Sequence, residues 1–286
     1  MATAPAISVV IPVLDGATTL GIQLAALLEQ RCPEPFEVVV ADNGSSDATV
    51  AVAEAFADPR LRVVDASALP RNASAAKNAG VGAARAPLLA FCDADDQVAD
   101  GWLAAVLGAL HDHPVVSVTC EHRRLNPQLS DRSCPATVVE RWFRGVPVFS
   151  GGAFGVRRDH YESVGGFAEH RTGAVDYEFA LRHYRRFRVA PVPSGATVHV
   201  RLRTDPWLAF RSSRALHASL VDLAREYADL IEPEPWSPAS EWRSWVRLAR
   251  AMSWWRSPDL RIQWAWLAAE RVGGLARLGR PERDPR

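Results

Sequence analysis

The chain has 286 residues with 33 basic and 33 acidic side chains, so its formal net charge is zero. A neutral balance provides no global field for capturing nucleic acid, and we expect no nucleic-acid partner. Apolar residues make up 48% and charged residues 23% of the chain. This composition is typical of a globular protein and excludes disordered, collagen-like or coiled-coil organisation for the bulk of the chain.

The four cysteines, Cys32, Cys92, Cys120 and Cys134, form no C-x-x-C pair. This pattern is typical of reduced thiols in a cytosol rather than of a disulfide framework or a zinc site. The first residues show no charged leader followed by an apolar run, and no stretch approaches the roughly 18 apolar residues of a membrane span. We therefore expect a cytoplasmic protein without a signal peptide.

Short apolar runs alternate with helical stretches over the first 120 residues. The runs are continuous and rich in β-branched residues, which predicts strands buried on both faces of a mostly parallel sheet. The predicted strands cover 7–13, 36–41, 61–64, 88–92 and 115–120, and the predicted helices cover 18–30, 47–57, 74–85 and 101–111. This alternation indicates an open α/β sheet flanked by helices, in which ligands bind beyond the carboxyl ends of the strands.

The pattern changes in the second half of the chain. Residues 121–147 carry three prolines and predict a long irregular loop, followed by a glycine-rich turn at 150–152 and short helices. Further strands are predicted over 187–192 and 196–200, and helices over 207–230, 239–255 and 259–278. We therefore predict a catalytic-type α/β domain over 1–205, with halves of about 1–120 and 121–205, and a C-terminal helical region over 206–286.

Polar residues follow two of the predicted strands at their carboxyl ends. Asp15 comes two residues after the first strand, and Asp42-Asn43-Gly44 follows the second. One interpretation of the second segment is a turn ahead of a helix N-terminus. The other is that Asp42 accepts hydrogen bonds from a nucleobase or ribose, and the two alternatives stay open on the sequence.

An acidic cluster, Asp93-Ala94-Asp95-Asp96, follows the fourth strand. Three carboxylates in four residues repel one another unless a cation sits among them. In extended backbone, residues i and i+2 point the same way, so Asp93 and Asp95 can converge on one ligand. Hard oxygen ligands suit Mg²⁺ or Mn²⁺, whereas the structural alternative is a solvated acidic turn.

The sequence contains no phosphate-binding glycine loop of either the G-x-G-x-x-G or the G-x-x-x-x-G-K-[ST] type. The phosphates of a nucleotide would then need a metal ion. This disfavours dehydrogenases and P-loop kinases and agrees with the acidic cluster.

Taken in order, these segments resemble the family-2 glycosyltransferases, nucleotide-sugar enzymes of the GT-A fold. The matching segments are Val9-Val10-Ile11-Pro12-Val13 with Asp15, Asp42-Asn43-Gly44-Ser45-Ser46-Asp47, Asn72 through Lys77-Asn78-Ala79-Gly80, Asp93-Ala94-Asp95-Asp96, Gly165-Gly166-Phe167, and Asp176-Tyr177-Glu178 through Arg182. The resemblance covers about residues 6–203. Each motif is weak alone, and the ordered set is specific.

The resemblance implies a role for each matching position. Asp42 contacts the base, with Asn43 beside it, and Asp15 lies near the ribose. The remaining donor-binding positions implied are Pro12 and Val13 at the base, Lys77 at the nucleotide or phosphate, Asp93 with Ala94 at the ribose and sugar, and Gly151 and Gly152 at the sugar and acceptor. Asp95 binds the metal, and Asp176 matches the general base of inverting enzymes.

Val175 and His199 lie near the end of the region that resembles the family. The family usually has Glu before the base, and here Val175 precedes Asp176, which removes a polar partner near the acceptor. In this fold a histidine after the sheet can complete the metal site, and His199 stands at the end of a predicted strand. A neutral imidazole tolerates Mn²⁺ better than Mg²⁺, and the alternative is a half-buried structural histidine.

The C-terminal region is rich in tryptophan and arginine. Seven of the ten tryptophans lie between Trp236 and Trp266, and residues 240–286 carry ten arginines against five acids. One interpretation is a helical appendage that packs on the catalytic domain or forms a homodimer. The other is an interfacial helix at the anionic inner membrane face, which would suit a lipid-linked acceptor.

The sequence thus predicts an inverting glycosyltransferase of the hexosyltransferase type. The expected donor is a UDP-sugar, the cofactor Mn²⁺ or Mg²⁺, and the acceptor a saccharide, a lipid-linked or a small-molecule hydroxyl. Two alternatives stay open: a nucleotide-sugar binding protein without turnover, suggested by Val175, and a nucleotidyltransferase of related fold. The latter should carry a glycine-rich loop with a basic residue after the first strand, which Leu14-Asp15-Gly16 is not.

Overall fold

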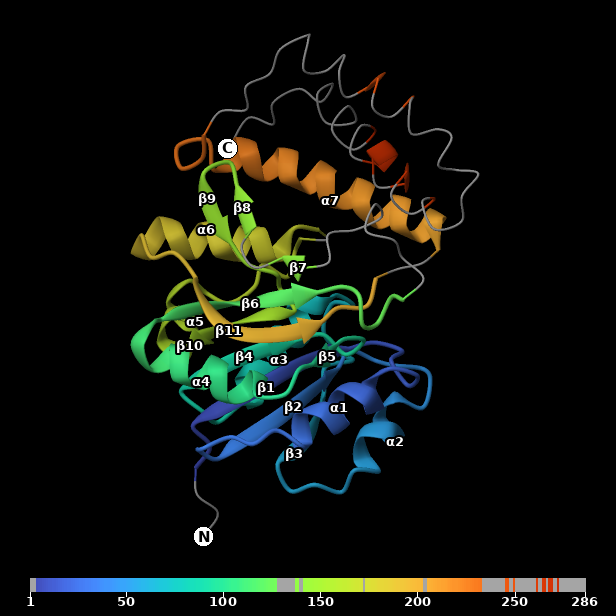
Figure 1. Ribbon diagram of the computed structural model, residues 1–286, viewed down its shortest axis with the longest axis vertical. Coiled ribbons are helices and arrows are strands. Elements are labelled where there is room, and N and C mark those ends of the chain that lie inside the picture. The colour runs from blue at the N-terminus through green and yellow to red at the C-terminus, as the bar shows by residue number, and fades with distance from the viewer. Residues whose placement is uncertain are drawn as a thin grey trace. The chain divides into compact units, whose positions relative to one another are not determined.

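The computed structural model describes residues 4–127, 137–138, 141–171, 173–202 and 205–232, with positions 245, 246, 249, 261, 264, 265, 267–269 and 272. The chain forms two compact units, and Figure 1 labels their elements. The first unit comprises residues 1–125, 137–171 and 175–201. The second comprises residues 126–136, 172–174 and 202–286.

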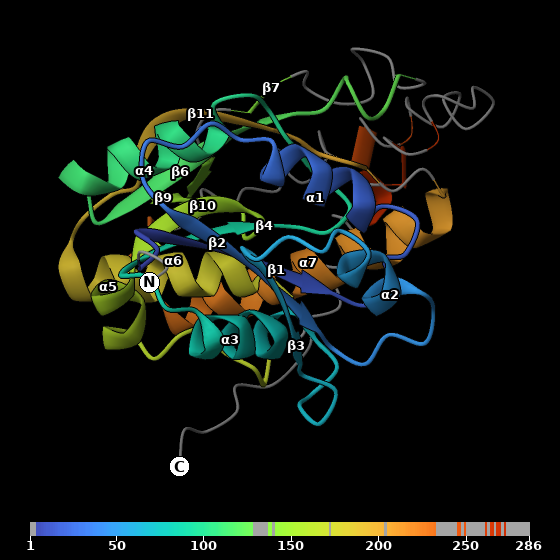
Figure 2. The same ribbon diagram turned by 90° about the horizontal axis from the view of Figure 1, so that it is seen from below.

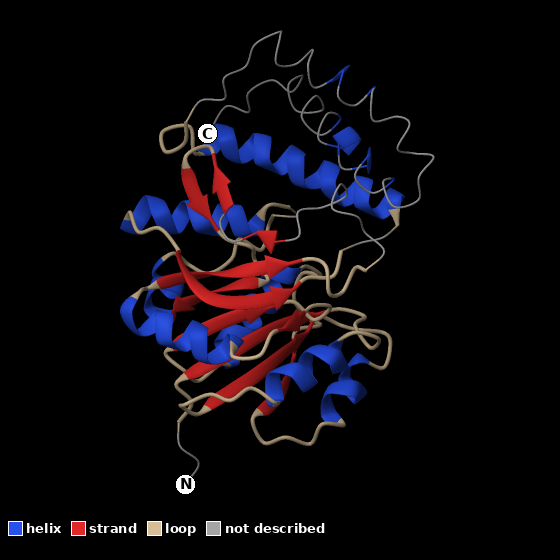
Figure 3. Cartoon of the chain, viewed as in Figure 1, coloured by secondary structure: helices blue, strands red, loops and turns tan. Residues whose placement is uncertain are grey.

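The first unit is built on a nine-stranded sheet of the described residues, red in Figure 3. Its path runs β3-β2-β1-β4-β10-β6-β11-β5, with β7 paired to β6. The strands are β1 (Ile7–Val13), β2 (Phe36–Asp42), β3 (Leu61–Asp65), β4 (Leu88–Cys92), β5 (Gln97–Val98), β6 (Val115–Glu121), β7 (Thr137–Val138), β10 (Ala153–Arg157) and β11 (Val192–His199). Strands β1 to β4 are parallel to one another, β11 is parallel to β6, and β10 is antiparallel to both of its neighbours. The predicted mostly parallel α/β sheet is confirmed.

Helices cover both faces of this sheet, as Figure 2 shows. One face carries α1 (Leu20–Leu28), α2 (Thr49–Glu54) and α4 (Trp102–Asp112), and the other carries α3 (Ala73–Ala83), α5 (Arg158–Ser163) and α6 (Val175–Phe187). The four helices predicted in the first half are all present, each shorter than its predicted range by one to five residues or shifted by one. Their ends lack the strong capping signals that would fix the boundary from sequence, except at Asn72, whose side chain accepts from Ala75 N.

The continuous apolar strands are explained by a core on each face. In β1, Ile7, Val9 and Ile11 face the α1 and α4 side and join the main cluster, whereas Val10 faces α3. All seven residues of β1 and of β2 are buried. Because every side chain of such a strand is buried, the strand shows no alternation of polar and apolar residues.

An aromatic cluster fills the second face beneath β4 and β10. Phe91 of β4 stacks on Phe154 of β10 with ring centroids 4.6 Å apart, and Phe154 stacks on Phe149 at 4.2 Å. Phe179 of α6 packs against Phe167 at 4.8 Å. Aromatic pairs at these separations contribute packing beyond simple area burial, so α6 is held at a fixed place under the sheet.

The close approach of α3 to β1 requires glycine at position 80. A Cβ there would lie 2.5 Å from Cγ1 of Val10. We expect Gly80→Ala to lower the free energy of unfolding by about 1–3 kcal/mol, because the packed core must shift. Gly82, in the same helix, is exposed with nothing within 4 Å of its Cβ position. Gly82→Ala should instead stabilise by up to about 1 kcal/mol through helix propensity. Urea unfolding of both variants checks this, and an equal effect of the two would contradict it.

The prediction of a strand over 187–192 is wrong. Phe187 ends α6, because its ring packs on His160 and His183 with centroids 4.1 and 5.0 Å away, and a single strand, β11, begins at Val192. The predicted strand over 196–200 lies largely within β11. The sequence prediction missed β10. This strand contains Gly155, and the position requires glycine because a Cβ there would lie 2.8 Å from Val106 Cγ1.

The segment predicted as an irregular loop contains regular structure near its end. A two-stranded hairpin joins β8 (Arg141–Phe143) and β9 (Val146–Val148) through Arg144 and Gly145, both at positive φ. Phe143 packs edge-on against Tyr177 of α6, with centroids 5.7 Å apart. The hairpin is therefore anchored to the start of α6.

The second unit contains α7 (Pro206–Glu226), close to the helix predicted over 207–230. Asp205 caps this helix by accepting from Leu208 N at 2.7 Å, and Pro206 occupies its first turn. Within the described part of the chain, no helix is long and apolar enough to cross a membrane. Most of the Trp- and Arg-rich region, including the helices predicted over 239–255 and 259–278, lies outside the described residues.

Candidate active site

The carboxyl ends of β1, β2 and β4 meet at one edge of the sheet. Val13 is in register with Asp42, and Val10 of β1 with Phe91 of β4. Pro12 and Val13 are the last two residues of β1 and are both buried. The segments that follow these strands therefore share one edge, as the α/β prediction requires.

The turn after β2 satisfies the Asp42 carboxylate locally. Its oxygens accept from the backbone N–H groups of Gly44 at 3.3 Å and Ser45 at 3.2 Å. Asn43 is 2% exposed; its Nδ2 donates to Ala66 O at 2.9 Å, and its Oδ1 has no hydrogen-bond partner among the described residues. A turn thus follows β2, and the Oδ1 of Asn43 is a buried acceptor without a hydrogen-bond partner among the described residues.

Asp15 fastens the loop after β1 to the loop after β2. Its backbone is left-handed, with φ of +53°, its N–H donates to Ser45 Oγ at 2.8 Å, and its Oδ1 accepts from Ser46 N at 2.7 Å. Its side chain remains 44% exposed and lies 3.9 Å from Arg71 Nη2. One of its oxygens therefore braces the site, while the side chain still reaches solvent.

Lys77 of α3 lies between the end of β4 and the turn before β10. Its side chain is 4% exposed, and its Nζ donates to Gly151 O at 2.7 Å. Nζ also lies 3.6 Å from Asp93 Oδ1 and 5.3 Å from the centroid of the Phe167 ring. Next to Lys77, Asn78 holds the loop after α5 by binding Phe167 O at 2.9 Å and Tyr161 Oη at 2.5 Å. The asparagine of this motif is structural, and the lysine faces the site.

Gly151 and Gly152 allow two carboxylates to approach the backbone. A Cβ on Gly152 would lie 2.2 Å from Asp93 Oδ2, and one on Gly151 would lie 2.9 Å from Asp176 Cβ. Gly151 N donates to Asp176 Oδ2 at 3.1 Å. Any side chain at either position would clash, so these glycines place Asp93 and Asp176 on the two ends of one short turn.

Asp176 lies in the first turn of α6, which begins at Val175. Burial raises the pKa of Asp176 above its ordinary value, against the opposing effects of the Gly151 hydrogen bond and the Lys77 charge. Glu178, two residues on, forms a bidentate pair with Arg182 at 2.7 and 2.8 Å. This i,i+4 pair holds Glu178 as a structural group, while Asp176 faces Gly151.

The acidic turn after β4 is joined to the end of β11. Asp96 is 5% exposed and its Oδ1 accepts from Arg201 N at 2.8 Å, while Arg201 Nε donates to Asp95 O at 3.1 Å. Burial, followed by the charge of Asp93, raises the pKa of Asp96 to about 8. Ala94 is buried and Asp95 is exposed. The turn therefore presents Asp95 to solvent, whereas Asp96 anchors the turn.

His199 lies next to this turn through strand pairing. It is in register with Gln97 of β5, two residues after Asp95. Its Nδ1 lies 2.8 Å from Glu121 Oε2, and its Nε2 lies 3.5 Å from Arg124 Nη1. A histidine that donates Nδ1–H to a carboxylate keeps its Nε2 lone pair for another partner, and this arrangement is typical of metal-binding histidines.

The donor set suits a divalent cation of the hard or borderline type. Asp95 offers an exposed carboxylate and His199 an imidazole oriented by Glu121. The described residues contain no ready-made group of three or more His, Cys, Asp or Glu ligands. The protein side chains thus fit two ligands of a cation whose remaining ligands come from elsewhere.

The structure brings two groups of the predicted site residues together. One group is linked by contacts at the turn before β10: Lys77, Asp93, Gly151, Gly152 and Asp176. The other lies at the ends of β1 and β2 and in the loops that follow them: Pro12, Val13, Asp15, Asp42 and Asn43. Sequence reasoning missed Glu121, Arg124 and Arg201 beside His199 and the acidic turn. No sequence motif marks them, because they meet the turn only through the β5–β11 and β6–β11 pairings.

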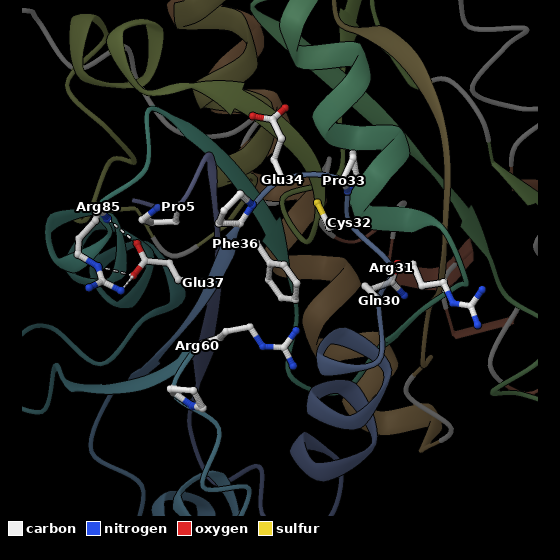
Figure 4. Close-up of a pocket in the computed structure, with 12 residues that line it drawn as sticks. Pro5, Gln30, Arg31, Cys32, Pro33, Glu34, Phe36, Glu37, Arg60 and Arg85 are labelled. Carbon is white, nitrogen blue, oxygen red and sulfur yellow. Dashed lines mark hydrogen bonds and ion pairs between the residues drawn. The ribbon is translucent and has the colours of Figure 1, made fainter. Parts of the chain in front are cut away.

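A separate pocket of about 730 Å³ lies at the opposite, amino ends of β1 and β2 (Figure 4). Its walls include Cys32, Phe36 and Arg60. Arg60 is already paired with Asp58 at 2.7 Å and stacks over Phe36 at 4.7 Å. None of the predicted site residues lines this pocket, so it is distinct from the candidate active site.

The sequence model of glycosyl transferase family 2 matches residues 8–165, and the chain belongs to this family. Its fold is the GT-A fold, as the ordered motifs predicted.

Among its relatives is the validoxylamine A glucosyltransferase of Streptomyces hygroscopicus subsp. limoneus. It is 32% identical in a 216-residue alignment that covers 62% of this chain and 48% of that protein. The uncharacterized protein MT1568 of Mycobacterium tuberculosis is 29% identical over 92% of this chain and 83% of its own length. The chain spans about half the length of the first curated relatives it matches, 48% and 51%.

Solved structures share the fold. The mannosyltransferase PcManGT from Pyrobaculum calidifontis, in complex with GDP-Man and Mn²⁺, aligns with a TM-score of 0.62 and 21% identity over 97% of this chain and 88% of its own. TarS 1–349 of S. aureus aligns with a TM-score of 0.56 and 17% identity over 97% and 93%. At such identities the likeness concerns the fold alone.

Proposed function

We propose that the protein transfers a sugar from a nucleotide diphosphate sugar to an acceptor hydroxyl with inversion at the anomeric carbon. The observation that carries this proposal is the pair of carboxylates at the Gly151–Gly152 turn. Asp93, at the donor strand end, and Asp176, at the start of α6, approach the backbone of consecutive glycines. A donor held on one side and a base on the other suit an in-line displacement.

Asp176 acts as the general base in this proposal. It accepts the proton of the acceptor hydroxyl as that oxygen attacks the anomeric carbon and the nucleoside diphosphate departs. Its place in the first turn of α6 favours the carboxylate through the helix dipole. Burial opposes this effect by raising its pKa, which makes the carboxylate a stronger base.

The nucleotide lies in this proposal at the loops after β1 and β2. Pro12, Val13 and Asp42 line the base, and Asp15 lies near the ribose. TarS 1–349 has been solved with UDP-GlcNAc, which supports a UDP-sugar, whereas PcManGT carries GDP-Man.

Asp95 and His199 hold a divalent cation, Mn²⁺ or Mg²⁺, in this proposal. A cation there neutralises charge on the departing diphosphate. Nε2 of His199 faces the Arg124 guanidinium at 3.5 Å, so this arginine must give way to the cation. The Mn²⁺ in PcManGT supports the choice of metal.

The acceptor is a saccharide, a lipid-linked or a small-molecule hydroxyl, and the relative named for validoxylamine A supports hexose transfer to a small molecule. We retain as proposals the catalytic domain over 1–205, the helical region over 206–286 and its contact with a membrane surface or a second copy. Trp245, in that region, is 38% exposed.

A binding protein without turnover is the second candidate, because Val175 replaces the usual Glu before the base.

A donor panel tests the function. Nucleotide sugars with uracil or guanine bases are added with Mn²⁺, and the thermal midpoint and release of nucleoside diphosphate are measured. A ligand that binds only the folded state raises the thermal midpoint. At a concentration of 100 times its Kd it adds about 2.7 kcal/mol to the free energy of unfolding. We expect UDP-sugars to raise it most and to be consumed when acceptor is present. Stabilisation without consumption by any donor and acceptor would identify the binding protein instead.

A further inference from the structure

Lys77 is the only lysine in the chain, and it is buried rather than on the surface. The other 32 of the 33 basic residues are arginines. A buried ammonium is strongly unfavourable unless charged and polar groups compensate it. The groups that compensate Lys77 therefore indicate what its charge is used for.

Those groups come from both sides of the site. The Nζ atom donates to Gly151 O at 2.7 Å and lies 3.6 Å from Asp93 Oδ1, and the ring of Phe167 lies beneath it. The N–H of the same Gly151 donates to Asp176 Oδ2. Gly151 therefore bridges the lysine and the base, one through its carbonyl and the other through its amide.

Lys77 and Asp176 pack closely against Gly151. A Cβ on Gly151 would lie 3.3 Å from Lys77 Nζ and 2.9 Å from Asp176 Cβ, so lysine, turn and base are packed together. The charged groups around Asp176 are Lys77 from α3, Asp93 beyond it at the end of β4, and Glu178 along α6, which is bound to Arg182. Among these groups, Lys77 is the cation linked to Asp176 through Gly151, whereas Arg182 is bound to Glu178.

We propose that Lys77 is a positioning residue for Asp176, which fixes the Gly151–Gly152 turn between the two carboxylates and favours the ionised base. The inference rests on the proposed function, because it needs Asp176 to be the base. It differs from the nucleotide or phosphate contact that the family resemblance implies for this position, since the ammonium is already bound by Gly151 and Asp93.

Two substitutions separate these roles. Lys77→Met keeps the length and removes the charge, and Lys77→Arg keeps the charge. For Lys77→Met we expect the acid limb of the pH–rate profile to move to higher pH by about one unit or more, the smallest shift expected when an opposite charge beside a carboxylate is removed. Asp176 then ionises less readily, so kcat should fall most on the acid side of the profile. The Kd of the nucleoside diphosphate should stay within about threefold, and Lys77→Arg should recover part of kcat.

The single lysine also allows a test without turnover. Protein made with isotope-labelled lysine gives one lysine side-chain NMR signal, from Lys77. We expect Asp176→Asn and Asp93→Asn to move this signal. The matched control is Asp159→Asn, which removes an exposed carboxylate of α5 whose side chain is 74% exposed, and it should leave the signal in place.

The outcomes are distinct. A rise of tenfold or more in the Kd for nucleoside diphosphate in Lys77→Met, with the acid limb unmoved, would assign Lys77 to the nucleotide and overturn the inference. If the Lys77 NMR signal does not move in Asp176→Asn, the inference is overturned as well. If the wild type consumes no donor, the proposed function fails, and the NMR signal alone decides whether Lys77 senses Asp176. If Lys77→Met does not fold, the inference is still tested by the pH–rate profile and nucleotide Kd of Lys77→Arg. It is also tested by the Lys77 NMR signal of the labelled protein with and without Asp176→Asn.

Discussion

Asp176→Asn will lower sugar transfer by roughly 10²–10⁴, the usual contribution of a positioned general base. The substitution keeps the shape of the side chain and the hydrogen bond from Gly151 N to Oδ, which holds it at 3.1 Å. It removes the basic oxygen that accepts the proton of the acceptor. Because the proposed function places Asp176 at the acceptor and not at the nucleotide, the affinity for donor nucleotide should barely change. Steady-state transfer and nucleotide titration of the same preparation check both halves.

Glu178→Gln is the matched control for this loss. Glu178 lies in the same turn of α6 and carries the same kind of charge, yet its carboxylate is bound by Arg182. We expect a loss of about 1–3 kcal/mol in the free energy of unfolding, because the buried Glu178 side chain loses its charge-assisted bond to Arg182, with little change in rate. Normal turnover of Asp176→Asn with a true acceptor would mean that the base lies elsewhere or that the reaction is not this displacement.

Removal of divalent metal will weaken nucleoside diphosphate binding markedly and lower transfer by about 10²–10³, since a cation supplies several kcal/mol of charge stabilisation. Activity should return with Mn²⁺ or Mg²⁺. Asp95→Ala should abolish this dependence, because Asp95 is the exposed carboxylate of the acidic turn. Titration of the nucleotide in chelator and in metal checks the effect.

His199→Ala and Asp96→Asn refine the metal prediction. His199→Ala should weaken the metal response, and more for Mn²⁺ than for Mg²⁺, because imidazole prefers the softer ion. Asp96→Asn should act on stability instead, since Asp96 accepts from Arg201 N and anchors the turn. Equal nucleotide affinity of the wild type with and without metal would remove the metal from the proposal.

The first half of the fold was predictable because its signals are local. A strand such as β1 or β4 is a continuous apolar run whose limits match its predicted range, since both faces of the sheet are covered and every side chain is buried. The acidic turn and the Asp42–Asn43 turn were also predictable, because the residues that favour a turn are adjacent in the sequence. The i,i+4 pair of Glu178 and Arg182 follows from helix geometry alone.

Elements of the second half depend on distant partners. β10 was missed because Ala153–Arg157 carries a glycine at the place where Val106 packs, and the strand is specified by pairing with β4 and β6. Phe187 was assigned to a strand, yet its contacts with His160 and His183 continue α6. In both cases tertiary packing outweighs the local preference.

The sequence by itself determined the α/β class, the order of the motifs and the residue types at the strand ends, since each depends on neighbours within a few positions. The tertiary structure alone decided how those residues are used. It binds Lys77 to Gly151 and Asp93, directs Asp176 to Gly151, and gives His199 the partners Glu121 and Arg124. These contacts join residues 16 to 78 positions apart, and they arise only when strands and their crossover helices bring remote chain segments to one edge of the sheet.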